Sequence, residues 1–447
     1  MSTFPLVTEE TLRRYDVPAP RYTSYPTAPV WSDAIGPAAY AAALNRAAQT
    51  PAAPLSLYAH IPFCKERCAF CGCNVVITRS SATADRYLGA LMREMDTVAA
   101  RLGERRSLSQ IHWGGGTPTF LDERQIDQLW TATTRRFRVL PSAEVSIEID
   151  PVVTTASQLD LLRGLGFNRI SMGVQDLDPR VQVAITRIQS AEETRKALDH
   201  ARTLGFLGIN FDLIYGLPLQ TKETWRRTLE QILEMRPDRL AVYSFAYVPE
   251  VRPNQKRLPV VGIPAGADKL ELFRIAWEML TGAGYQQIGM DHFAVPEDEL
   301  AQAQSRRALG RNFQGYTVQT ATEVVAFGAS AISDIGGSYA QNSHALPRYE
   351  RAVNDGDLAV ERGALLSPDD LQRRAIISNI MCNFWVEVPK GFTAELARMV
   401  ELEREGLVTV RGREVEVTPL GRIFVRNVAS AFDAYLDKQK TTFSRAV

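Results

Sequence analysis

His60-Ile-Pro-Phe-Cys-Lys-Glu-Arg-Cys-Ala-Phe-Cys-Gly-Cys-Asn74 contains four of the five cysteines in a chain of 447 residues. The fifth, Cys382, stands alone near the other end of the sequence. Because a reducing compartment keeps thiols free for packing, metal binding or catalysis, this clustering indicates a function for the segment. The four clustered residues are Cys64, Cys68, Cys71 and Cys73.

The spacing Cys64-x3-Cys68-x2-Cys71 suits an iron–sulfur cluster. Three thiolates would hold three irons of a four-iron, four-sulfur cluster and leave the fourth iron open. Structural zinc sites usually take their four ligands as two separated pairs, and no second Cys or His pair lies nearby in the sequence. Cys73 would close the open position if it bound iron, so we interpret it as a nearby non-ligand. Its use as a substitute ligand is the alternative.

The composition predicts a globular protein without a large charged footprint. Lys and Arg together number 51, as do Asp and Glu, so bulk charge does not support binding to nucleic acid or to an anionic membrane. No apolar stretch of about 18 residues appears, and residues 1–14 lack the layout of a secretory signal. We therefore expect a cytoplasmic protein that does not insert into a membrane. Five cysteines are too few for a fold held by disulfides.

Short β-branched or aromatic runs alternate with helical patterns, which is typical of βα units and a parallel sheet. The expected strands cover residues 55–61, 109–113, 144–149, 169–174, 208–214 and 240–245. The expected helices between them cover residues 85–102, 123–136, 155–165, 191–204 and 221–235. This succession fits most of a barrel, although an open doubly wound sheet gives the same one-dimensional pattern.

Polar residues recur at the carboxyl ends of these strands. A carboxylate or an amide on a short apolar strand is costly unless it meets a partner or a ligand. Because the chemistry of barrels collects at this end, the recurrence predicts a common polar cavity and favours the barrel. Taken alone, Glu148 and Asp212 could be ion-pair or capping residues, and the glycine run could be a tight turn. The residues are Tyr58, His60, Gly114-Gly-Gly-Thr-Pro-Thr119, Glu148, Asp150, Gln175, Asp212 and Tyr247.

Further motifs accompany the cysteine segment, in which Phe70 directly precedes the third cysteine. They are Pro20-Arg-Tyr-Thr-Ser-Tyr-Pro-Thr27, His112-Trp-Gly-Gly-Gly-Thr-Pro-Thr119, Arg169-Ile-Ser-Met-Gly-Val-Gln175, Asp212-Leu-Ile-Tyr-Gly-Leu-Pro218, Gly289-Met-Asp-His-Phe-Ala294, Arg311-Asn-Phe-Gln-Gly-Tyr-Thr317 and Phe443-Ser-Arg445. The cysteine motif alone resembles the radical S-adenosylmethionine superfamily. With the other motifs, nearly the whole chain resembles the oxygen-independent coproporphyrinogen III oxidases.

The resemblance implies an α/β fold, a partial (β/α)6 barrel of the radical S-adenosylmethionine type, and a specific reaction. Two propionate side chains of coproporphyrinogen III would be decarboxylated oxidatively to vinyl groups, giving protoporphyrinogen IX for haem biosynthesis without molecular oxygen. The cofactors would be a 4Fe-4S cluster and S-adenosyl-L-methionine, of which family members hold two molecules. The electron donor would be a protein such as a flavodoxin or a ferredoxin, and we expect a monomer.

By the same resemblance, residue roles carry over motif by motif. The iron ligands would be Cys64, Cys68 and Cys71. Cys73 would be required for catalysis without binding iron. The cluster-bound S-adenosylmethionine would contact Gly115, Glu148 and Tyr58, of which Tyr58 would also be catalytic. The second molecule would be lined by Phe70, Gly116, Thr117, Gln175, Arg187, Asp212, Ala246 and Ile332.

These roles agree with side-chain chemistry. Carboxylates suit ribose hydroxyls or an ammonium group, Arg187 can hold a carboxylate bidentately, and Phe70 offers an aromatic surface to adenine. The substrate carries four carboxylates, so cations must contact it. The candidates are Arg21, Arg252, Lys256, Arg257 and Arg311. A basic surface loop is the alternative explanation for residues 252–257.

Three regions are expected: an N-terminal arm that contributes to the substrate site (1–50), the catalytic barrel (51–349) and a smaller, mostly helical C-terminal domain (350–447). In the last, a helix over 396–406 and a hairpin over 407–418 resemble a winged helix. Residues 361–447 hold 13 Lys and Arg against 12 Asp and Glu, which is poor support for DNA binding, so we expect a lid or packing domain. Cys382 lies in an apolar helix and is interpreted as a buried small hydrophobe.

Two rival functions share the cysteine motif. A haem-binding chaperone would be a carrier, but such relatives lack the arm at residues 21–27 and carry a His-Asn-x-x-Tyr-Trp motif that this sequence does not contain. Another radical enzyme, or a close paralogue, that acts on haem or a different tetrapyrrole is the second alternative. The arm and the segment 312–316 favour the oxidase.

Overall fold

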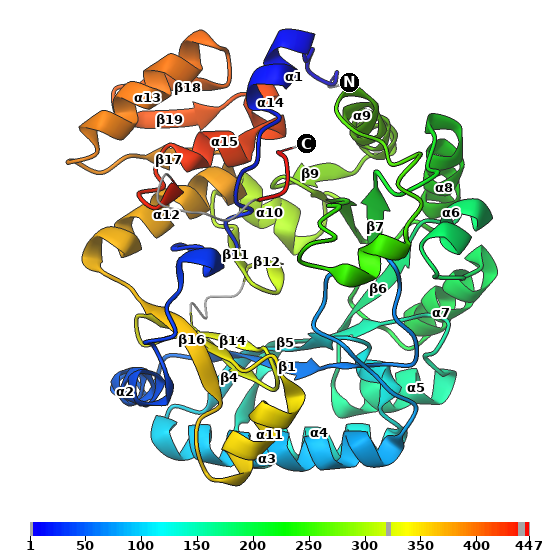
Figure 1. Cartoon of the computed structure of the whole chain (residues 1–447), viewed down its shortest axis with the longest axis vertical. Coiled ribbons are helices and arrows are strands. Elements are labelled where there is room, and N and C mark those ends of the chain that lie inside the picture. The colour runs from blue at the N-terminus through cyan, green and yellow to red at the C-terminus, as the bar shows by residue number, and fades with distance from the viewer. Residues whose placement is uncertain (1–2, 319–322, 437–442, 447) are drawn as a thin grey trace.

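The computed structural model describes residues 3–318, 323–436 and 443–446. A mixed, 12-stranded sheet runs through it, with helices along its outer side (Figure 1). From one edge of the sheet to the other, the strands are β16 (Val360–Leu365), β15 (Ser338–Asn342), β14 (Ile332–Ile335), β13 (Val324–Phe327), β1 (Leu55–Ile61), β4 (Ser107–Gly115), β5 (Arg138–Ile149), β6 (Arg169–Gln175), β7 (Gly208–Tyr215), β8 (Arg239–Ser244), β10 (His292–Ala294) and β9 (Gln286–Ile288).

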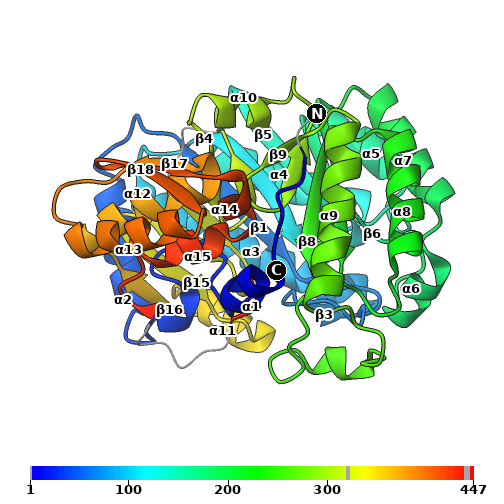
Figure 2. The same ribbon diagram turned by 90° about the horizontal axis from the view of Figure 1, so that it is seen from above.

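Neighbouring strands from β1 through β4, β5, β6 and β7 to β8 run parallel and follow one another in chain order. A doubly wound sheet would reverse its strand order at a switch point, whereas sequential order is that of a barrel. The expected partial (β/α)6 barrel is therefore confirmed. The expected helices lie outside its strands (Figures 1 and 2) and are α3 (Ser81–Leu102), α4 (Glu123–Arg136), α5 (Ala156–Leu165), α7 (Ala191–Thr203) and α8 (Lys222–Met235).

Local sequence signals start most of these helices. A capping box opens α4, α5, α7 and α8, so that the residue before the helix and the third helical residue exchange hydrogen bonds. In α7, for example, the Ser190 hydroxyl accepts from the backbone N–H of Glu193, whose carboxylate accepts from the Ser190 N–H. Each helix thus begins at a defined distance from the strand before it.

Side chains along β6 separate the core of the barrel from its lumen. Ile170, Met172 and Val174 are buried in the main apolar core, whereas Ser171 and Gln175 line the cavity described below. Successive residues of a strand point to opposite faces, so the apolar set faces the helices and the polar set faces the lumen.

The main sheet extends beyond the six expected strands on both sides. On one side β13 pairs parallel with β1, and β14, β15 and β16 continue antiparallel; on the other, β10 and β9 follow β8 antiparallel. The sheet thus continues to Leu365, past the domain boundary expected at residue 350, because β16 pairs along β15. The sequence pattern did not reveal this extension.

After β16 the chain forms a smaller unit of helices around a three-stranded sheet (Figure 1). Its elements are α12 (Pro368–Asn383), β17 (Trp385–Glu387), α13 (Thr393–Arg404), β18 (Val408–Arg411), β19 (Glu414–Val417), α14 (Pro419–Ile423) and α15 (Val425–Ser430). The hairpin β18–β19 follows α13 as expected, which is the element order of a winged helix. Cys382 is fully buried in α12.

The N-terminal arm packs on this smaller unit. The arm contains α1 (Glu9–Tyr15) and α2 (Pro37–Ala47), and Tyr22 and Tyr25 are buried in the apolar core of the C-terminal unit. Near the other end of the chain, Arg445 forms a β-bridge with Pro18. The buried Arg426 guanidinium donates to the carbonyls of both Pro20 and Arg445. The two ends of the chain are therefore held side by side.

The remaining elements are short or lie at the edges of the barrel. They are β2 (Phe63–Cys64), β3 (Val76–Ile77), β11 (Gly310–Asn312), β12 (Gly315–Thr317), α6 (Pro179–Ala184), α9 (Ala267–Gly282), α10 (Glu299–Ser305), α11 (Leu346–Asn354) and three 3-10 turns at Ala28–Val30, Pro118–Phe120 and Pro253–Arg257. No helix in the described part of the chain is both long enough and apolar enough to span a membrane.

Candidate active site

A cavity of about 550 Å³ lies at the carboxyl ends of the barrel strands. It is lined by residues from the loops after β1 and β4, from β5, β6 and β7, and from the loop after α6. In barrels of this kind the carboxyl ends of different strands supply one site. The expected site residues that line it are Cys64, Cys68, Phe70, Cys71, Cys73, Gly115, Gly116, Thr117, Glu148, Gln175, Arg187 and Asp212.

The cysteine loop is anchored by the parallel pairing of β2 with β3. Cys64 Sγ lies 3.5 Å from Thr117 Oγ1, and Arg187 Nη1 lies 4.0 Å from Cys68 Sγ. Donors next to sulfur stabilise the thiolate, which is the form that binds a metal. Burial acts in the opposite direction and outweighs the Thr117 contact, so the pKa of Cys64 is raised to about 11. These contacts and the loop geometry bring two of the expected ligands to one wall of the cavity.

The third expected ligand, Cys71, interacts directly with Cys73. The backbone N–H of Cys73 donates to Cys71 Sγ at 3.4 Å. Hydrogen bonding from Cys73 lowers the pKa of the Cys71 thiol to about 6, and Arg67 and Arg252 add to this effect. Cys71 is thus the thiol of this loop that ionises most readily, and Cys73 is the residue that supports it.

The arrangement of these sulfur atoms distinguishes a cluster from a single ion. Among the described residues, no three His, Cys, Asp or Glu side chains are placed to share one metal ion. An iron–sulfur cluster does not require such convergence, because each iron takes its own thiolate. The three thiols on one short loop therefore fit a 4Fe-4S cluster better than a zinc ion.

Tyr58 lies on β1 behind the cysteine loop and is not among the residues that line the cavity. Its hydroxyl is 3.0 Å from His60 Nδ1, and His60 Nε2 is 3.0 Å from the carbonyl oxygen of Asn74. Burial and the nearby Glu148 raise the pKa of Tyr58 well above its ordinary value. Tyr58 therefore stays protonated and connects β1 with the end of the cysteine loop.

The loop after β4 depends on its glycines. Gly115 has a φ of 125°, which side chains disfavour, and a Cβ on Gly116 would lie 2.7 Å from the Phe63 carbonyl oxygen. The backbone N–H of Gly115 donates to Glu148 Oε2 at 3.0 Å. The glycines thus let this loop pass between the cysteine loop and Glu148.

Two carboxylates in the lumen have different acidities. His112 Nε2 lies 3.2 Å from Glu148 Oε1, and although burial acts to raise it, this contact holds the pKa of Glu148 below its ordinary value. Asp212 accepts hydrogen bonds from Ser171 at 3.0 Å and from Asn210 at 2.9 Å. Burial, followed by the charge of Glu148, nevertheless raises the pKa of Asp212 to about 6. Glu148 is therefore ionised at neutral pH, and Asp212 titrates just below it.

Gln175 and Arg187 form the wall at the end of β6. Gln175 has a φ of 67°, an uncommon conformation that is found at functional sites. Arg187 donates from Nη1 to Asp150 Oδ2 at 2.8 Å and from Nη2 to the Gly173 carbonyl at 2.7 Å. Its buried Nε has no hydrogen-bond partner among the described atoms. The Nε edge of Arg187 is therefore the part of its guanidinium that no described atom satisfies.

Two more of the expected cofactor residues, Ala246 and Ile332, do not line this cavity. Ala246 follows β8, and its carbonyl accepts a hydrogen bond from Gln255 at 3.1 Å. Ile332 begins β14, on the other side of β13 from β1.

The five cations expected to contact substrate fall into two groups, and none of them lines the main cavity. Arg21 donates to the Ser244 carbonyl at 3.1 Å and lies 3.6 Å from Asp291, while Arg311 donates to the Arg21 carbonyl at 2.7 Å. These two cations sit at the end of β8. The second group, Arg252, Lys256 and Arg257, lies in the loop after β8.

Two amides in that same loop hold the cysteine loop, and our sequence analysis did not identify them. Asn254 Nδ2 lies 3.3, 3.0 and 3.0 Å from the carbonyl oxygens of Cys68, Ala69 and Cys71. Gln255 Nε2 donates to the Phe70 carbonyl at 3.2 Å. Nothing in the sequence marks an Asn–Gln pair in a polar loop for this role, because the pair follows β8 whereas its partners follow β1.

Known proteins resemble this chain in sequence and in fold. The family model described as the Radical SAM superfamily matches residues 58–232. The oxygen-independent coproporphyrinogen III oxidase of Salmonella typhimurium is 43% identical over 450 residues, which cover 98% of this chain and 97% of that protein. The protein of the same name from Synechocystis sp. is 41% identical over 465 residues and is covered completely, as is this chain.

A solved structure extends the comparison to the fold. Coproporphyrinogen III oxidase (HemN) from Escherichia coli, described as a radical SAM enzyme, superposes with a TM-score of 0.90 at 41% identity, covering 96% of this chain and 100% of that one. Identity at this level over the full length of both chains accompanies the shared cysteine loop and barrel. The chain therefore belongs to the oxygen-independent coproporphyrinogen III oxidases of the radical SAM superfamily, whose cofactors are a 4Fe-4S cluster and S-adenosyl-L-methionine.

Proposed function

We propose that this protein decarboxylates two propionate side chains of coproporphyrinogen III to vinyl groups, which yields protoporphyrinogen IX for haem biosynthesis without molecular oxygen. One observation carries the proposal: Cys64, Cys68 and Cys71 line the same cavity as Glu148 and Asp212 in a chain that matches the named oxidases over its whole length. Each conversion removes a hydrogen atom, carbon dioxide and one electron, and the electron passes to an external acceptor.

Cys64, Cys68 and Cys71 would hold the cluster, and S-adenosylmethionine would occupy the cavity beside it. When bound, these groups supply the adenosyl radical that removes a hydrogen atom from the propionate. Glu148 is ionised, so its carboxylate can accept hydrogen bonds from ribose hydroxyls or an ammonium group. Gly115 has no side chain, so S-adenosylmethionine could approach the backbone closely at this position.

The finer residue roles extend this proposal. A second S-adenosylmethionine would lie against Phe70, Gly116 and Thr117, with the further contacts Gln175, Arg187, Asp212, Ala246 and Ile332. Cys73 would act in catalysis without binding iron, because it supports the ionised Cys71. Tyr58 would position the cysteine loop through His60.

For the substrate carboxylates, we favour Arg21 and Arg311. Both guanidinium groups gather around the end of β8 together with the arm that carries Arg21. Arg252, Lys256 and Arg257 are weaker candidates, because they lie in the loop that packs against the outside of the cysteine loop. The arm (1–50) would thereby contribute to the substrate site of the barrel (51–349), with the C-terminal unit (350–447) packed beside it.

We further propose that the protein acts as a monomer in the cytoplasm and receives electrons from a flavodoxin or a ferredoxin. Free thiol ligands require a reducing compartment, which supports this location.

The test is an anaerobic assay of the purified protein with reductant, S-adenosylmethionine and coproporphyrinogen III. We expect about four irons per chain, formation of 5'-deoxyadenosine and a product that has lost two carbon dioxide units by mass. Cys73→Ser should keep the cluster and lose turnover. Formation of 5'-deoxyadenosine with no decarboxylated product would contradict the proposal and favour a paralogue that acts on another tetrapyrrole.

A further inference from the structure

One buried arginine of α15 and the end of the chain hold the arm next to Arg21. The arginine is Arg426, and we call residues 443–446 the tail. We propose that Arg426, together with the tail, positions Arg21 for the substrate carboxylates by clamping the arm. This inference rests on the proposed function, because Arg21 is a substrate contact only if the protein binds coproporphyrinogen III.

The guanidinium group of Arg426 holds the arm directly before Arg21. Arg426 is 4% exposed and donates to the carbonyl oxygens of Ala19 and Pro20, the second at 3.2 Å. The Pro20 carbonyl and the Arg21 N–H belong to one planar peptide unit, so fixing that carbonyl also fixes the direction in which the chain continues into Arg21. The planar fork of a guanidinium group suits contacts with several carbonyls, which the compact ammonium group of a lysine cannot reproduce.

The tail lies along the same stretch of the arm. Figure 1 shows the tail (red) beside the arm (blue). The backbone N–H of Ala19 donates to the Ser444 carbonyl at 3.1 Å, and the N–H of Ala446 donates to the Val17 carbonyl at 3.0 Å. Arg426 also donates to the Ser444 carbonyl, at 2.8 Å. Arm, tail and guanidinium group therefore form one hydrogen-bonded unit.

The arm is held directly after Arg21 as well. Tyr22 has a φ of 47°, an uncommon conformation that persists only where the surroundings hold it. Its hydroxyl donates to Asp433 Oδ2 at 3.1 Å. Arg311 donates to the carbonyl of Arg21 itself at 2.7 Å. Arg21 is thus held on both sides, and the C-terminal unit supplies Arg426 on one side and Asp433 on the other.

Exposure separates the two arginines into a contact residue and a positioning residue. The side chain of Arg21 is 31% exposed and can meet a ligand, whereas Arg426 is buried. Within the described part of the chain, the hydrogen bonds of Arg426 all go to neutral oxygen atoms. Burial, followed by the charge of Arg21, lowers the pKa of Arg426 to about 9. A buried cation without a carboxylate partner is costly, which favours a functional role for its contacts with the arm.

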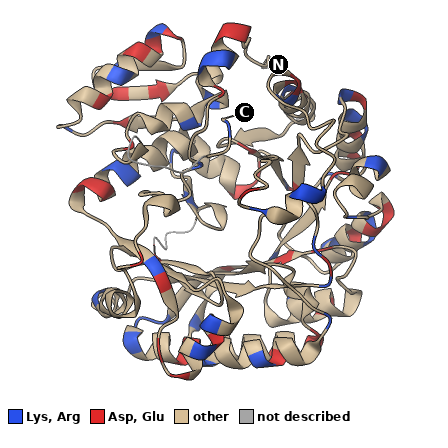
Figure 3. Cartoon of the chain, viewed as in Figure 1, with Lys and Arg blue, Asp and Glu red and all other residues tan. Residues whose placement is uncertain are grey.

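Positive charge accumulates where the arm crosses the end of β8. Five cations lie there near three carboxylates, whereas positive and negative residues alternate along the outer helices (Figure 3). An excess of cations favours a ligand with several carboxylates, such as the substrate. The position of the arm decides whether Arg21 belongs to this group. The cations are Arg21, Lys269, Arg311, Arg426 and Arg445, and the carboxylates are Asp16, Asp291 and Asp433.

The test compares two arginines that are equally buried. Arg426→Lys keeps a cation but loses the planar fork. The control, Arg105→Lys, changes an arginine that is 3% exposed and donates to the carbonyls of Ala47 and Ala53. Arg105 precedes β4 at the amino ends of the strands, opposite the end where Arg21 lies. We expect the KM for coproporphyrinogen III to rise about tenfold in Arg426→Lys with an unchanged kcat, which corresponds to one charge-assisted contact, and to stay unchanged in the control.

A double variant separates positioning from an independent effect. Arg21→Gln alone should raise the KM by a similar factor, and adding Arg426→Lys should raise it no further, because both changes remove the same contact. Iron content and the affinity for S-adenosylmethionine should match the wild type in all of these variants. Additive increases in KM would overturn the proposal, because Arg426 would then act without Arg21. An unchanged KM in either single variant would overturn it too.

The tail offers a second variant that leaves the buried guanidinium group intact. Ala446→Pro removes the N–H that donates to the Val17 carbonyl, so the KM should rise about threefold, in keeping with the loss of one hydrogen bond. An unchanged KM in this variant would exclude the tail from the clamp.

Hydrogen exchange distinguishes a failure of this inference from a failure of the proposed function. The amides of residues 16–22 should exchange faster in Arg426→Lys than in the wild type, and at the wild-type rate in Arg105→Lys. Unchanged exchange in Arg426→Lys would overturn the clamp whatever the activity. If the wild type makes no decarboxylated product, the proposed function fails and the substrate role of Arg21 fails with it, whereas the exchange still decides whether Arg426 holds the arm.

Discussion

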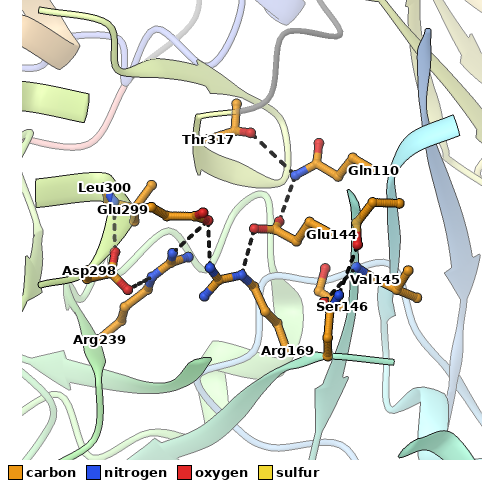
Figure 4. Close-up of polar contacts among 12 residues, drawn as sticks. Gln110, Glu144, Val145, Ser146, Arg169, Arg239, Asp298, Glu299, Leu300 and Thr317 are labelled. Carbon is orange, nitrogen blue, oxygen red and sulfur yellow. Dashed lines mark hydrogen bonds and ion pairs between the residues drawn. The ribbon is translucent and has the colours of Figure 1, made fainter. Parts of the chain in front are cut away.

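The two ends of the barrel strands carry similar polar residues but use them differently. At the amino ends, charged side chains pair with one another across the lumen (Figure 4). At the carboxyl ends, the carboxylates and the guanidinium group face a cavity of about 550 Å³. The same strands thus form a closed base at their amino ends and an open mouth at their carboxyl ends.

The base is closed by an ion-pair network between the strands and α10. Arg169 lies 2.8 Å from Glu144 and 2.6 Å from Glu299. Arg239 lies 2.7 Å from Asp298 and 3.2 Å from Glu299. Only about 130 Å³ remains open beside this network. Two guanidinium groups thus meet three carboxylates, so every charged group of this network has a partner within the chain.

At the mouth, the polar groups are compensated incompletely. Arg187 keeps a buried Nε without a partner among the described atoms, and Asp212 has a raised pKa. Such groups cost stability unless a ligand completes them. Internal pairing at the base therefore supplies stability, whereas incomplete pairing at the mouth leaves these groups free to bind cofactor and substrate.

The largest expected effect comes from substitutions that disrupt the mouth and leave the base intact. Replacement of Cys64, Cys68 or Cys71 by Ser should remove the cluster absorbance and reduce turnover below detection, because the hydroxyl is a poor iron ligand. Iron analysis and the visible spectrum of the anaerobically reconstituted variants measure this. A normal cluster in any one of the three variants would exclude that residue as a ligand.

The second prediction concerns a substitution that disrupts the base and leaves the mouth intact. Arg239→Ala leaves the buried Asp298 carboxylate without its cation and leaves Glu299 with Arg169 alone, so the free energy of unfolding should fall by about 3–5 kcal/mol. Urea denaturation of the apoprotein measures this loss, with the exposed Arg135→Ala on α4 as a control that stays within about 0.5 kcal/mol. Iron content per folded molecule should match the wild type. A loss of iron binding without a loss of stability would show that the base acts on the site.

The third prediction uses the titration of Asp212. Because its pKa is raised to about 6, the carboxylate becomes protonated below that pH and accepts hydrogen bonds poorly. Binding of S-adenosylmethionine should therefore weaken by up to about tenfold for each pH unit below 6. Equilibrium dialysis at pH 5.5 and 7.5 measures this change, and Asp212→Asn should remove most of the difference. Equal affinity of the wild type at both pH values would exclude Asp212 from the contact.

The same shift has the opposite sign for stability. A raised pKa means that the folded protein binds this proton more readily than the unfolded chain does. The contribution of Asp212 to stability is therefore fully present below its ordinary pKa and is lost as the pH rises through 6. Weaker binding at low pH would consequently not reflect unfolding caused by this group.

The smallest expected effect concerns the cysteine that lies outside both regions. Cys382 is fully buried in α12, so Cys382→Ala should cost about 1 kcal/mol of stability by removing a packed sulfur. Iron content should stay at about four per chain. Thermal unfolding and iron analysis measure the two quantities. Loss of iron would mean that Cys382 takes part in cluster binding or assembly.

Much of the barrel was predictable because its signals are local. Each strand is a short apolar run, and the capping boxes before α4, α5, α7 and α8 lie within four residues. The strands β13 to β16 were not predicted, since they are short and continue the sheet through pairings between distant segments, including the parallel pairing of β13 with β1. Asn254 was missed for the same reason, because its role depends on contacts with residues 68–71 across the barrel.

The kind of chemistry could be predicted from local sequence motifs alone. Three ligands of an iron–sulfur cluster can come from one short loop, so the spacing of Cys64, Cys68 and Cys71 is enough to predict them as ligands. Which polar residues the chain itself satisfies, and which remain for ligands, depends on contacts that form only in the folded chain. Glu144 and Glu148 lie on the same strand, yet one pairs with Arg169 at the base and the other faces the cavity at the mouth. That difference arises from which distant side chains the fold brings within hydrogen-bonding distance.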